Sequence, residues 1–175
     1  MTCSALIRVA TEEDVSRLAE LYVRTLRDAY AGTMPAEFSD PVSEPERASK
    51  LRDAILAGTR TWLIAVAGQE LVGGCAVAVA RDSDLPSDFG EITTIAVTRA
   101  HRRHGHGLAL LNAALSHAYH HAWRALVLWV VQSNVDARAF YACVGFVPDG
   151  SFKIDDRLGF SAQVVRYRSP VGLPR

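Results

Sequence analysis

A short segment between two apolar stretches carries the residues best suited to chemistry. It reads Val97-Thr98-Arg99-Ala100-His101-Arg102-Arg103-His104-Gly105-His106-Gly107-Leu108 and is crowded with arginine, histidine and glycine. An apolar run over residues 92–97 predicts a strand before it, and helical periodicity over residues 108–122 predicts a helix after it.

This succession of strand, loop and helix start is typical of a phosphate site. Gly105 and Gly107 allow the backbone to approach a ligand closely. The first N–H groups of a helix have no intrahelical partner, and the helix dipole there favours negative charge. Arg102 and Arg103 add positive charge. We therefore expect a phosphorylated ligand at this turn.

The composition is that of an ordinary globular protein of 175 residues. Acidic and basic residues balance, so no overall field draws the chain to nucleic acid or to a membrane. Cys3, Cys75 and Cys143 form no CxxC pair, which argues against a disulfide framework or a structural zinc site. No apolar run approaches the roughly 20 residues that span a bilayer, and no signal-peptide pattern is present. We predict a soluble cytoplasmic protein with one domain over residues 1–168 and a flexible tail at 169–175.

The first half of the chain predicts a strand, two helices and a hairpin. Leu6–Val9 is the strand, and residues 11–14 offer a helix start. The first helix should turn these residues inward: Val15, Leu18, Ala19, Tyr22, Leu26, Ala29 and Tyr30. A second helix over residues 43–57, closed by Gly58, should bury Ala48, Leu51 and Ile55. Residues 61–67 and 71–80 should pair as an antiparallel hairpin.

The second half alternates between strands and helices. The helix over residues 108–122 should bury Leu108, Leu111, Leu115, Ala118 and Ala122. Residues 126–131 are continuously apolar and predict a buried parallel strand, followed by a short helix over residues 135–144. Residues 146–147 and 163–167 predict the last two strands, separated by a polar loop around Asp155 and Asp156. This order implies an α/β fold with a mixed sheet and helices on both faces.

Four features in this order resemble the GNAT superfamily of N-acetyltransferases. The first is the loop Arg102-Arg103-His104-Gly105-His106-Gly107, which matches the family pattern of Gln or Arg, two residues, Gly, one residue, then Gly or Ala. The second is the preceding strand, Glu91-Ile92-Thr93-Thr94-Ile95-Ala96-Val97. The third is Leu128-Trp129-Val130-Val131-Gln132-Ser133-Asn134, a strand that ends in Asn. The fourth is Ala139-Phe140-Tyr141-Ala142-Cys143-Val144-Gly145-Phe146, which matches the family's aromatic-Tyr-x-x-x-Gly-Phe ending.

The resemblance implies a central mixed, mostly antiparallel sheet of about seven strands with about four flanking helices. Two parallel strands would splay apart at the cofactor site. The implied reaction moves the acetyl group of acetyl-CoA to a primary amine of a small molecule or protein, by direct attack in a ternary complex. The residues implied to bind acetyl-CoA are Ile95, Ala96, Val97, Arg102, Arg103, His104, Gly105, His106, Gly107, Leu108, Asn134 and Tyr141.

In the family, the loop would hold the pyrophosphate, and the backbone of residues 95–97 would pair with the pantetheine arm. Asn134 would contact that arm from the far side. The family often has Pro where Arg99 stands and Gly where Arg103 stands, so this loop is more cationic than usual.

The reaction requires two proton transfers. An amine with a pKa of about 10 is protonated at neutral pH and cannot attack a thioester. Glu91 is the candidate general base, acting directly or through a water. Tyr141 is the candidate general acid toward the sulfur, and an N–H within residues 95–97 is the candidate oxyanion donor.

Each assignment has a structural alternative. Arg102 and Arg103 could be solvated surface charges, and Glu91 could be an exposed edge carboxylate. Tyr141 could fill the core beside Phe140. Asn134 could cap the helix that follows it, which is compatible with cofactor contact.

The histidines raise the question of a metal. All six lie between His101 and His121, and His117 and His121 are one helical turn apart. A helical wheel anchored on Leu111 and Leu115 turns both toward solvent, and no acidic residue or cysteine nearby completes a tetrahedral set. We predict no metal site. Cys143, without an activating base, is expected to be buried filler.

Two other functional classes compete with the enzyme. A non-catalytic acyl-CoA-binding or sensing module would keep the loop but would not need Tyr141 or Glu91. A nucleic-acid-binding protein would need net positive charge and interleaved aromatics, which the chain lacks. The sequence does not identify the acceptor amine, and it leaves open whether the protein forms a homodimer. The residues expected to shape the acceptor site are Tyr30, Met34, Phe38, Asp40, Asp149, Phe152, Asp155, Asp156 and Phe160.

Overall fold

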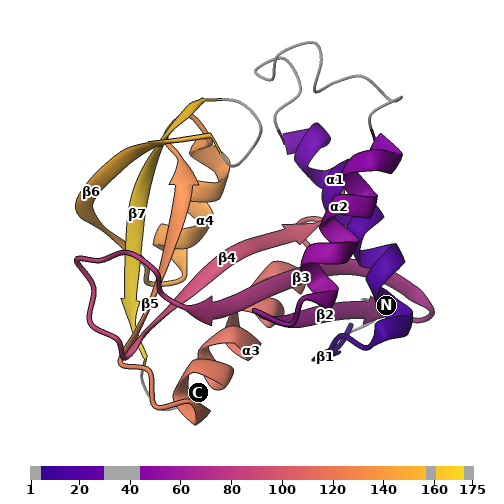
Figure 1. The fold of residues 1–175 in the computed structure, drawn as a ribbon, viewed down its shortest axis with the longest axis horizontal. Helices are drawn as coiled ribbons and strands as arrows, with labels where there is room; N and C mark the ends of the chain where they lie inside the picture. Colours follow the sequence, from indigo (N-terminus) through magenta and orange to yellow (C-terminus); the bar gives the residue numbers. More distant parts are fainter. Residues whose placement is uncertain (1–4, 30–43, 157–160, 172–175) are drawn as a thin grey trace. The chain divides into compact units, whose positions relative to one another are not determined.

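Seven strands in the described part of the chain form one sheet in the order β1-β2-β3-β4-β5-β7-β6. The computed structural model describes residues 5–29, 44–156 and 161–171, and Figure 1 shows its elements. The strands are β1 (Leu6–Val9), β2 (Thr61–Ala67), β3 (Glu70–Val79), β4 (Phe89–Val97), β5 (Ala125–Val131), β6 (Val147–Asp155) and β7 (Ala162–Pro170). The helices are α1 (Val15–Ala29), α2 (Glu44–Leu56), α3 (His106–His120) and α4 (Val135–Cys143), with short 3-10 helices η1 (Glu12–Asp14) and η4 (Arg99–His101).

The strand directions make this sheet mixed, as predicted. β1 pairs with β2, β5 with β7, and β6 with β7 in antiparallel fashion. β4 and β5 run parallel, with Phe89 opposite Ala125 and Ile92 opposite Leu128. β2 and β3 are sheet neighbours joined by only two residues, a connection that antiparallel strands alone can make. In the described ranges, no helix has the length and apolarity needed to cross a membrane.

The chain forms two compact units, which are described separately. The first contains residues 1–76 and 94–114, and the second contains residues 77–93 and 115–175. The single domain over residues 1–168 stays a prediction. Strand β7 continues to Pro170, so ordered structure extends into the segment that the sequence predicts as a tail.

The core of the first unit lies between α1, α2 and strands β2 and β3. Figure 1 shows α1 and α2 beside each other. The buried residues of this core are Val15, Leu18, Ala19, Leu21, Tyr22, Ile55, Trp62, Ile64, Leu71 and Ala76. The predicted inner face of α1 is confirmed through Tyr22, but Leu26 is only partly buried and Ala29 is exposed. Tyr30 lies outside the described residues.

Helix α3 differs from the prediction in its start and in its buried face. It begins at His106 and ends at His120. Its most buried residues are Leu110, Leu111, Ala114 and Ala118, whereas Leu108 and Ala122 are exposed and Leu115 is only partly buried. Apolar residues occupy most positions of this helix, so helical periodicity did not define one face.

The last two strands are longer than predicted. Residues 147–155 form one strand, so Asp155 belongs to β6 and is buried instead of lying in a loop. Polar residues alternate along β6, and Asp149 and Lys153 take part in ion pairs. In this strand the apolar residues Phe152 and Ile154 are exposed and the polar side is the more buried one, which is the reverse of the usual pattern.

A buried carboxylate ties β1 to the start of α1. Asp14 is 4% exposed and accepts two hydrogen bonds from the guanidinium of Arg8, at 2.6 and 2.8 Å. It also accepts from the backbone N–H and the hydroxyl of Thr11, at 2.8 and 3.0 Å. The bonds from Arg8, with those from Thr11, hold the pKa of Asp14 well below its ordinary value despite burial.

Asp14→Asn should lower the free energy of unfolding by about 2 kcal/mol at pH 7, because it removes charge-assisted hydrogen bonds. The folded pKa lies below the unfolded value of about 3.9, so this stabilisation is present above pH 4 and is lost as the pH falls further. Urea titrations at pH 7 and pH 3 would measure both values. Asp53→Asn, on the exposed face of α2, is the control. If Asp14→Asn lowers the free energy of unfolding as much at pH 3 as at pH 7, the charge of Asp14 is not responsible for the stabilisation.

Candidate functional site

The loop between β4 and α3 folds back on the end of β4. We call residues 102–108 the cradle. The N–H of Thr98 donates to Val72 of β3, and the N–H of His101 donates to Thr98. The Nε of Arg102 donates to the carbonyl of Val97 at 3.3 Å. These bonds fix the path by which the chain leaves β4 and enters the cradle.

The cradle presents unused backbone donors. The first hydrogen bond of α3 runs from the N–H of Ala109 to the carbonyl of Gly105, at 3.0 Å. Within the described ranges, no carbonyl accepts from the N–H groups of residues 103–108. Gly105 has a φ of +84°, which favours glycine, and no atom lies within 4 Å of where its Cβ would be. The cradle can therefore receive an anion on its backbone N–H groups.

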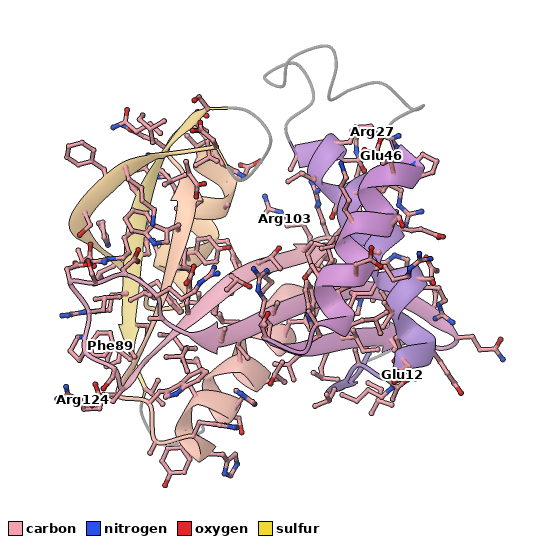
Figure 2. The ribbon with its side chains drawn as sticks, viewed as in Figure 1. Glu12, Arg27, Glu46, Phe89, Arg103 and Arg124 are labelled. Carbon is pink, nitrogen blue, oxygen red and sulfur yellow. The ribbon has the colours of Figure 1, made fainter. Side chains whose placement is uncertain are left out.

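Arg103 also takes a left-handed conformation, with a φ of 65°. For a residue with a Cβ this conformation costs roughly 1–2 kcal/mol. It occurs at the position where the resembled family often has glycine. Figure 2 labels Arg103 on the loop. Such strain is found most often at ligand sites, which agrees with a functional loop.

His106, the first residue of α3, is 6% exposed. The ring of His101 lies 6.1 Å from that of His106, and the ring of His104 lies 6.3 Å from it. Burial lowers the pKa of His106, and the charges of His101 and His104 lower it further. The cradle therefore holds a neutral imidazole at its centre at neutral pH.

Gly73 is a residue of this site that sequence reasoning missed. A Cβ on Gly73 would lie 2.8 Å from the carbonyl oxygen of Ala96 and 3.2 Å from the side chain of Val97. β3 can therefore approach the last residues of β4 only because this position is glycine. A glycine inside the apolar run of β3 was the available signal.

Glu91 is buried and is not the exposed edge carboxylate of the alternative reading. It lies in β4 opposite Val127, and the residue is 4% exposed. Alternation places it on the face of Phe89, which packs with Ala125 and Val127. Figure 2 labels Phe89, whose ring lies 5.9 Å from the Arg124 guanidinium. Its charged neighbour is Arg81, whose Nε lies 3.9 Å from Oε2 of Glu91.

Asn134 and Tyr141 are placed by the two ends of α4. The Oδ1 of Asn134 accepts from the N–H of Ala137 at 3.1 Å, so Asn134 does cap the helix. At the other end, the N–H of Phe146 donates to Tyr141 and the N–H of Gly145 donates to Ala142. Gly145 has a φ of 91°. This is a Schellman motif, in which the first and last residues also make an apolar contact.

The Tyr-x-x-x-Gly-Phe pattern is thus a helix cap that positions Tyr141. Its ring lies 6.1 Å from Phe146 and 6.4 Å from Tyr167, and the residue is 8% exposed. The Nε of Arg138 donates to the hydroxyl of Tyr167 at 3.2 Å. Tyr141 is therefore held among aromatic rings in one orientation.

Carboxylates of the second unit converge on Arg166, a cluster that sequence reasoning missed. Arg166 is 5% exposed and contacts Asp84 at 2.6 and 2.9 Å, and Asp149 at 2.6 Å. Asp82 accepts from Trp129 at 2.7 Å and from Lys153 at 3.0 Å. Burial raises the pKa of Asp82, but the bonds from Lys153 and Trp129 outweigh it, so the pKa is lowered. These carboxylates are charged and already partnered.

A comparison with known families shows to which family the chain belongs. Residues 23–146 match the sequence profile of the Acetyltransferase (GNAT) family. The chain belongs to the GNAT acetyltransferase family. The segment that matches contains all four features on which the predicted resemblance depends, and that prediction is confirmed.

Solved GNAT-fold structures cover nearly the whole chain. PaiA N-acetyltransferase from Thermoplasma acidophilum, in complex with coenzyme A, is 20% identical with a TM-score of 0.74, over 95% of this chain and 99% of that chain. YncA from Salmonella typhimurium, with its cofactor acetyl-CoA, is 16% identical with a TM-score of 0.70, over 98% of both chains. Ribosomal-protein-alanine N-acetyltransferase from Brucella melitensis is 20% identical with a TM-score of 0.70, over 94% and 99%.

Several residues expected at the acceptor site of this GNAT protein have other partners. Asp149 is paired with Arg166, and Asp156 accepts from the hydroxyl of Ser161. Asp155 is buried, and Phe152 is exposed. The remaining residues lie outside the described ranges: Tyr30, Met34, Phe38, Asp40 and Phe160.

Two further side chains differ from expectation. Cys143 is exposed, so the prediction of buried filler is wrong. Cys75, in contrast, is buried, and burial raises the pKa of its thiol to about 12. His117 is half-buried because it packs against Trp123, with ring centroids 5.6 Å apart. Among the described residues, no three His, Cys, Asp or Glu side chains gather as a metal site would require.

Gly73→Ala should disturb the end of β4. The new methyl group meets backbone at Ala96, which cannot rotate away, so we expect a loss of about 1–3 kcal/mol in stability. Calorimetric titration should show at least about tenfold weaker binding of coenzyme A, equal to about 1.4 kcal/mol.

Gly74→Ala is the matched control for this change, because the three atoms nearest to its Cβ would all belong to the side chains of Leu18 and Tyr22. It should lower the melting temperature without weakening coenzyme A binding. Equal coenzyme A affinity in the two variants would show that Gly73 does not shape a donor site.

His106→Asn should make the ligand-free protein less sensitive to acid. The folded pKa of His106 lies below the unfolded value of about 6.5, so the unfolded state binds more protons. The stability gained from a neutral His106 is complete above pH 6.5 and is lost as the pH falls through the folded pKa. Denaturant titrations at pH 7.5, 6.5 and 5.5 should show a steeper decline for wild type than for His106→Asn. An equally steep decline in the two proteins would contradict this role of His106.

Proposed function

We propose that this GNAT protein transfers the acetyl group of acetyl-CoA to a primary amine, of a small molecule or a protein, by direct attack in a ternary complex. The observation that carries the proposal is the cradle. It joins unused N–H groups to cationic side chains at the start of α3, in a chain that belongs to an acetyltransferase family. The two compact units would together form one acetyltransferase domain.

The donor would be held mainly by backbone groups. In this proposal the N–H groups and side chains of residues 102–108 bind the pyrophosphate of acetyl-CoA. The backbone of Ile95, Ala96 and Val97 pairs with the pantetheine arm as a strand would. Asn134 contacts the arm through its Nδ2 group, because its Oδ1 already caps α4. The relatives solved with coenzyme A or acetyl-CoA support this choice of donor.

Glu91 is the proposed general base, whereas three other carboxylates of the second unit are already held by cations. Arg166 and Lys153 hold Asp82, Asp84 and Asp149 in charge-assisted hydrogen bonds. A carboxylate bound in that way is a poor proton acceptor. Glu91 is buried, and its ion pair with Arg81 is long, at 3.9 Å. It can take the proton of the acceptor ammonium, directly or through a water.

Tyr141 is the proposed general acid. The free amine attacks the carbonyl carbon of the thioester, and an N–H within residues 95–97 stabilises the oxyanion. The C–S bond then breaks, and the phenol of Tyr141 gives its proton to the departing thiolate. The nitrogen that now carries the acetyl group loses its second proton, which restores the phenol of Tyr141, and an amide is left. Glu91 releases its proton to water. The Schellman cap and the aromatic packing of Tyr141 support this role, because a general acid must be held in one orientation.

Tyr141→Phe and Glu91→Gln should each lower kcat about 10²–10⁴-fold, the range that general acid–base catalysis contributes. The assay measures thiol release from acetyl-CoA with a panel of primary amines, including peptides with free N-termini. Coenzyme A affinity should stay near wild type, because the cradle is unchanged. Cys143→Ser, on an exposed position of α4, should keep wild-type turnover.

Two results would count against the proposal. Unchanged turnover in either variant would remove that residue from the mechanism. Coenzyme A binding without thiol release for any amine would favour the non-catalytic acyl-CoA-binding module.

A further inference from the structure

The buried cation Arg166 gathers three segments of the second unit. It lies in β7 and contacts Asp149 and Ser151 of β6, at 2.6 and 2.8 Å. It also contacts both carboxylate oxygens of Asp84 and, at 3.5 Å, one oxygen of Asp82, which belong to the connection between β3 and β4. We call these five residues the Arg166 cluster.

Asp82 is the best anchored point of the connection. Its Oδ2 accepts from the indole of Trp129 in β5, and its Oδ1 accepts from Lys153 in β6. The Lys153 ammonium lies 3.8 Å from the centre of the Trp129 ring. The carbonyl of Asp82 also accepts from the N–H of Leu85 at 3.1 Å. The position of Asp82 is therefore determined by contacts from β5, β6 and β7.

Arg81 lies between two fixed residues. On one side is Asp82, and on the other the N–H of Ala80 donates to the carbonyl of Phe89 at 2.9 Å. The backbone of Arg81 thus has little freedom to move. From this position its Nε lies 3.9 Å from Oε2 of Glu91, while its own side chain is 58% exposed.

The carboxylate of Glu91 needs such a partner. Its side chain is 6% exposed, so most of its hydration is lost in the folded protein. Arg81 offsets part of that loss and attracts Oε2 from one direction. The contact is too long for a firm hydrogen bond, so the other carboxylate oxygen and most of the lone pairs stay available for a proton.

We propose that Arg81 is a positioning residue for Glu91, and that the Arg166 cluster holds Arg81 in place. The inference rests on the proposed role of Glu91 as the general base. Arg81 directs the carboxylate toward the acceptor amine and does not itself exchange a proton. The Arg166 cluster acts on the reaction only through Arg81.

The first experiment compares Arg81→Gln and Arg81→Lys. Arg81→Gln should lower kcat about tenfold or more, with little change in KM for acetyl-CoA, and the loss should deepen on the acidic side of the pH–rate profile. Arg81→Lys, which keeps the charge, should recover part of the rate. The melting temperature should stay near wild type, because Arg81 is largely exposed. Arg124→Gln, which removes a surface ion pair with Asp88 in the same unit, should leave kcat unchanged.

The second experiment tests the link to the cluster. Removing Arg166 would leave several carboxylates without their cation and could unfold the protein, so the milder Asp84→Asn is used; its side chain is 60% exposed. Asp84→Asn should lower kcat severalfold in the wild-type background and have almost no effect in the Arg81→Gln background. Such non-additivity is expected when one residue acts through the other. Equal effects in both backgrounds would overturn the link.

The outcomes separate this inference from the proposed function. If Glu91→Gln is inactive while Arg81→Gln matches wild type in kcat and in its pH profile, the positioning role is wrong and the proposed base stands. If Glu91→Gln keeps full activity, both fail. A loss of kcat in Arg81→Gln without recovery in Arg81→Lys, or with a large drop in melting temperature, would indicate a structural role only.

Discussion

The parallel pairing of β4 with β5 is the constraint on which the rest of the site depends. Parallel neighbours cannot be joined by a tight turn, so the chain must leave β4 at Val97 and return to begin β5 at Ala125. The crossing segment contains a loop and α3, and it begins where β4 ends. The start of α3, with its unused N–H groups, must therefore follow the carboxyl end of β4 closely. The register between the two strands covers residues 89–92 of β4, although β4 continues to Val97.

The charged residues of this protein are concentrated in local groups. The chain has no formal net charge, yet the cradle is cationic and the second unit concentrates carboxylates around Arg166. Bonds from Asp84 and Asp149 raise the pKa of Arg166 despite burial, so this cation is permanent. A buried cation with several carboxylates is stable only when every member is hydrogen-bonded. Glu91 lies outside this cluster and is paired less closely, with the Nε of Arg81 at 3.9 Å from its Oε2.

Sequence reasoning succeeded for features that are determined by a few neighbouring residues. The loop before α3 and the helix end at Gly145 were predicted correctly because each depends on a backbone device: glycine at positive φ in one, a Schellman cap in the other. The parallel strand at β5 was also predicted, from a run of apolar residues buried on both faces. On the inner face of α3 it was right for Leu111 and Ala118 only, and it missed the length of β6, the role of Gly73 and the Arg166 cluster. Each of these depends on which distant segment packs opposite, and a pattern within one segment does not identify that segment.

The same contrast separates the two halves of the proposed reaction. Donor binding relies on backbone groups, which every residue carries, so a few glycines and helix ends are enough to arrange it. The proposed positioning of Glu91 relies on side chains from β5, β6, β7 and the connection after β3, which meet at Asp82 and Arg166. Their meeting depends on register, with Trp129 opposite Arg166 and Lys153 opposite Val164. A slip of one residue between β6 and β7 would turn Lys153 to the other face, away from Asp82 and Trp129. The register shifts between Pro148 and Phe152, so this irregularity helps determine that Lys153 lies where it can pair with Asp82.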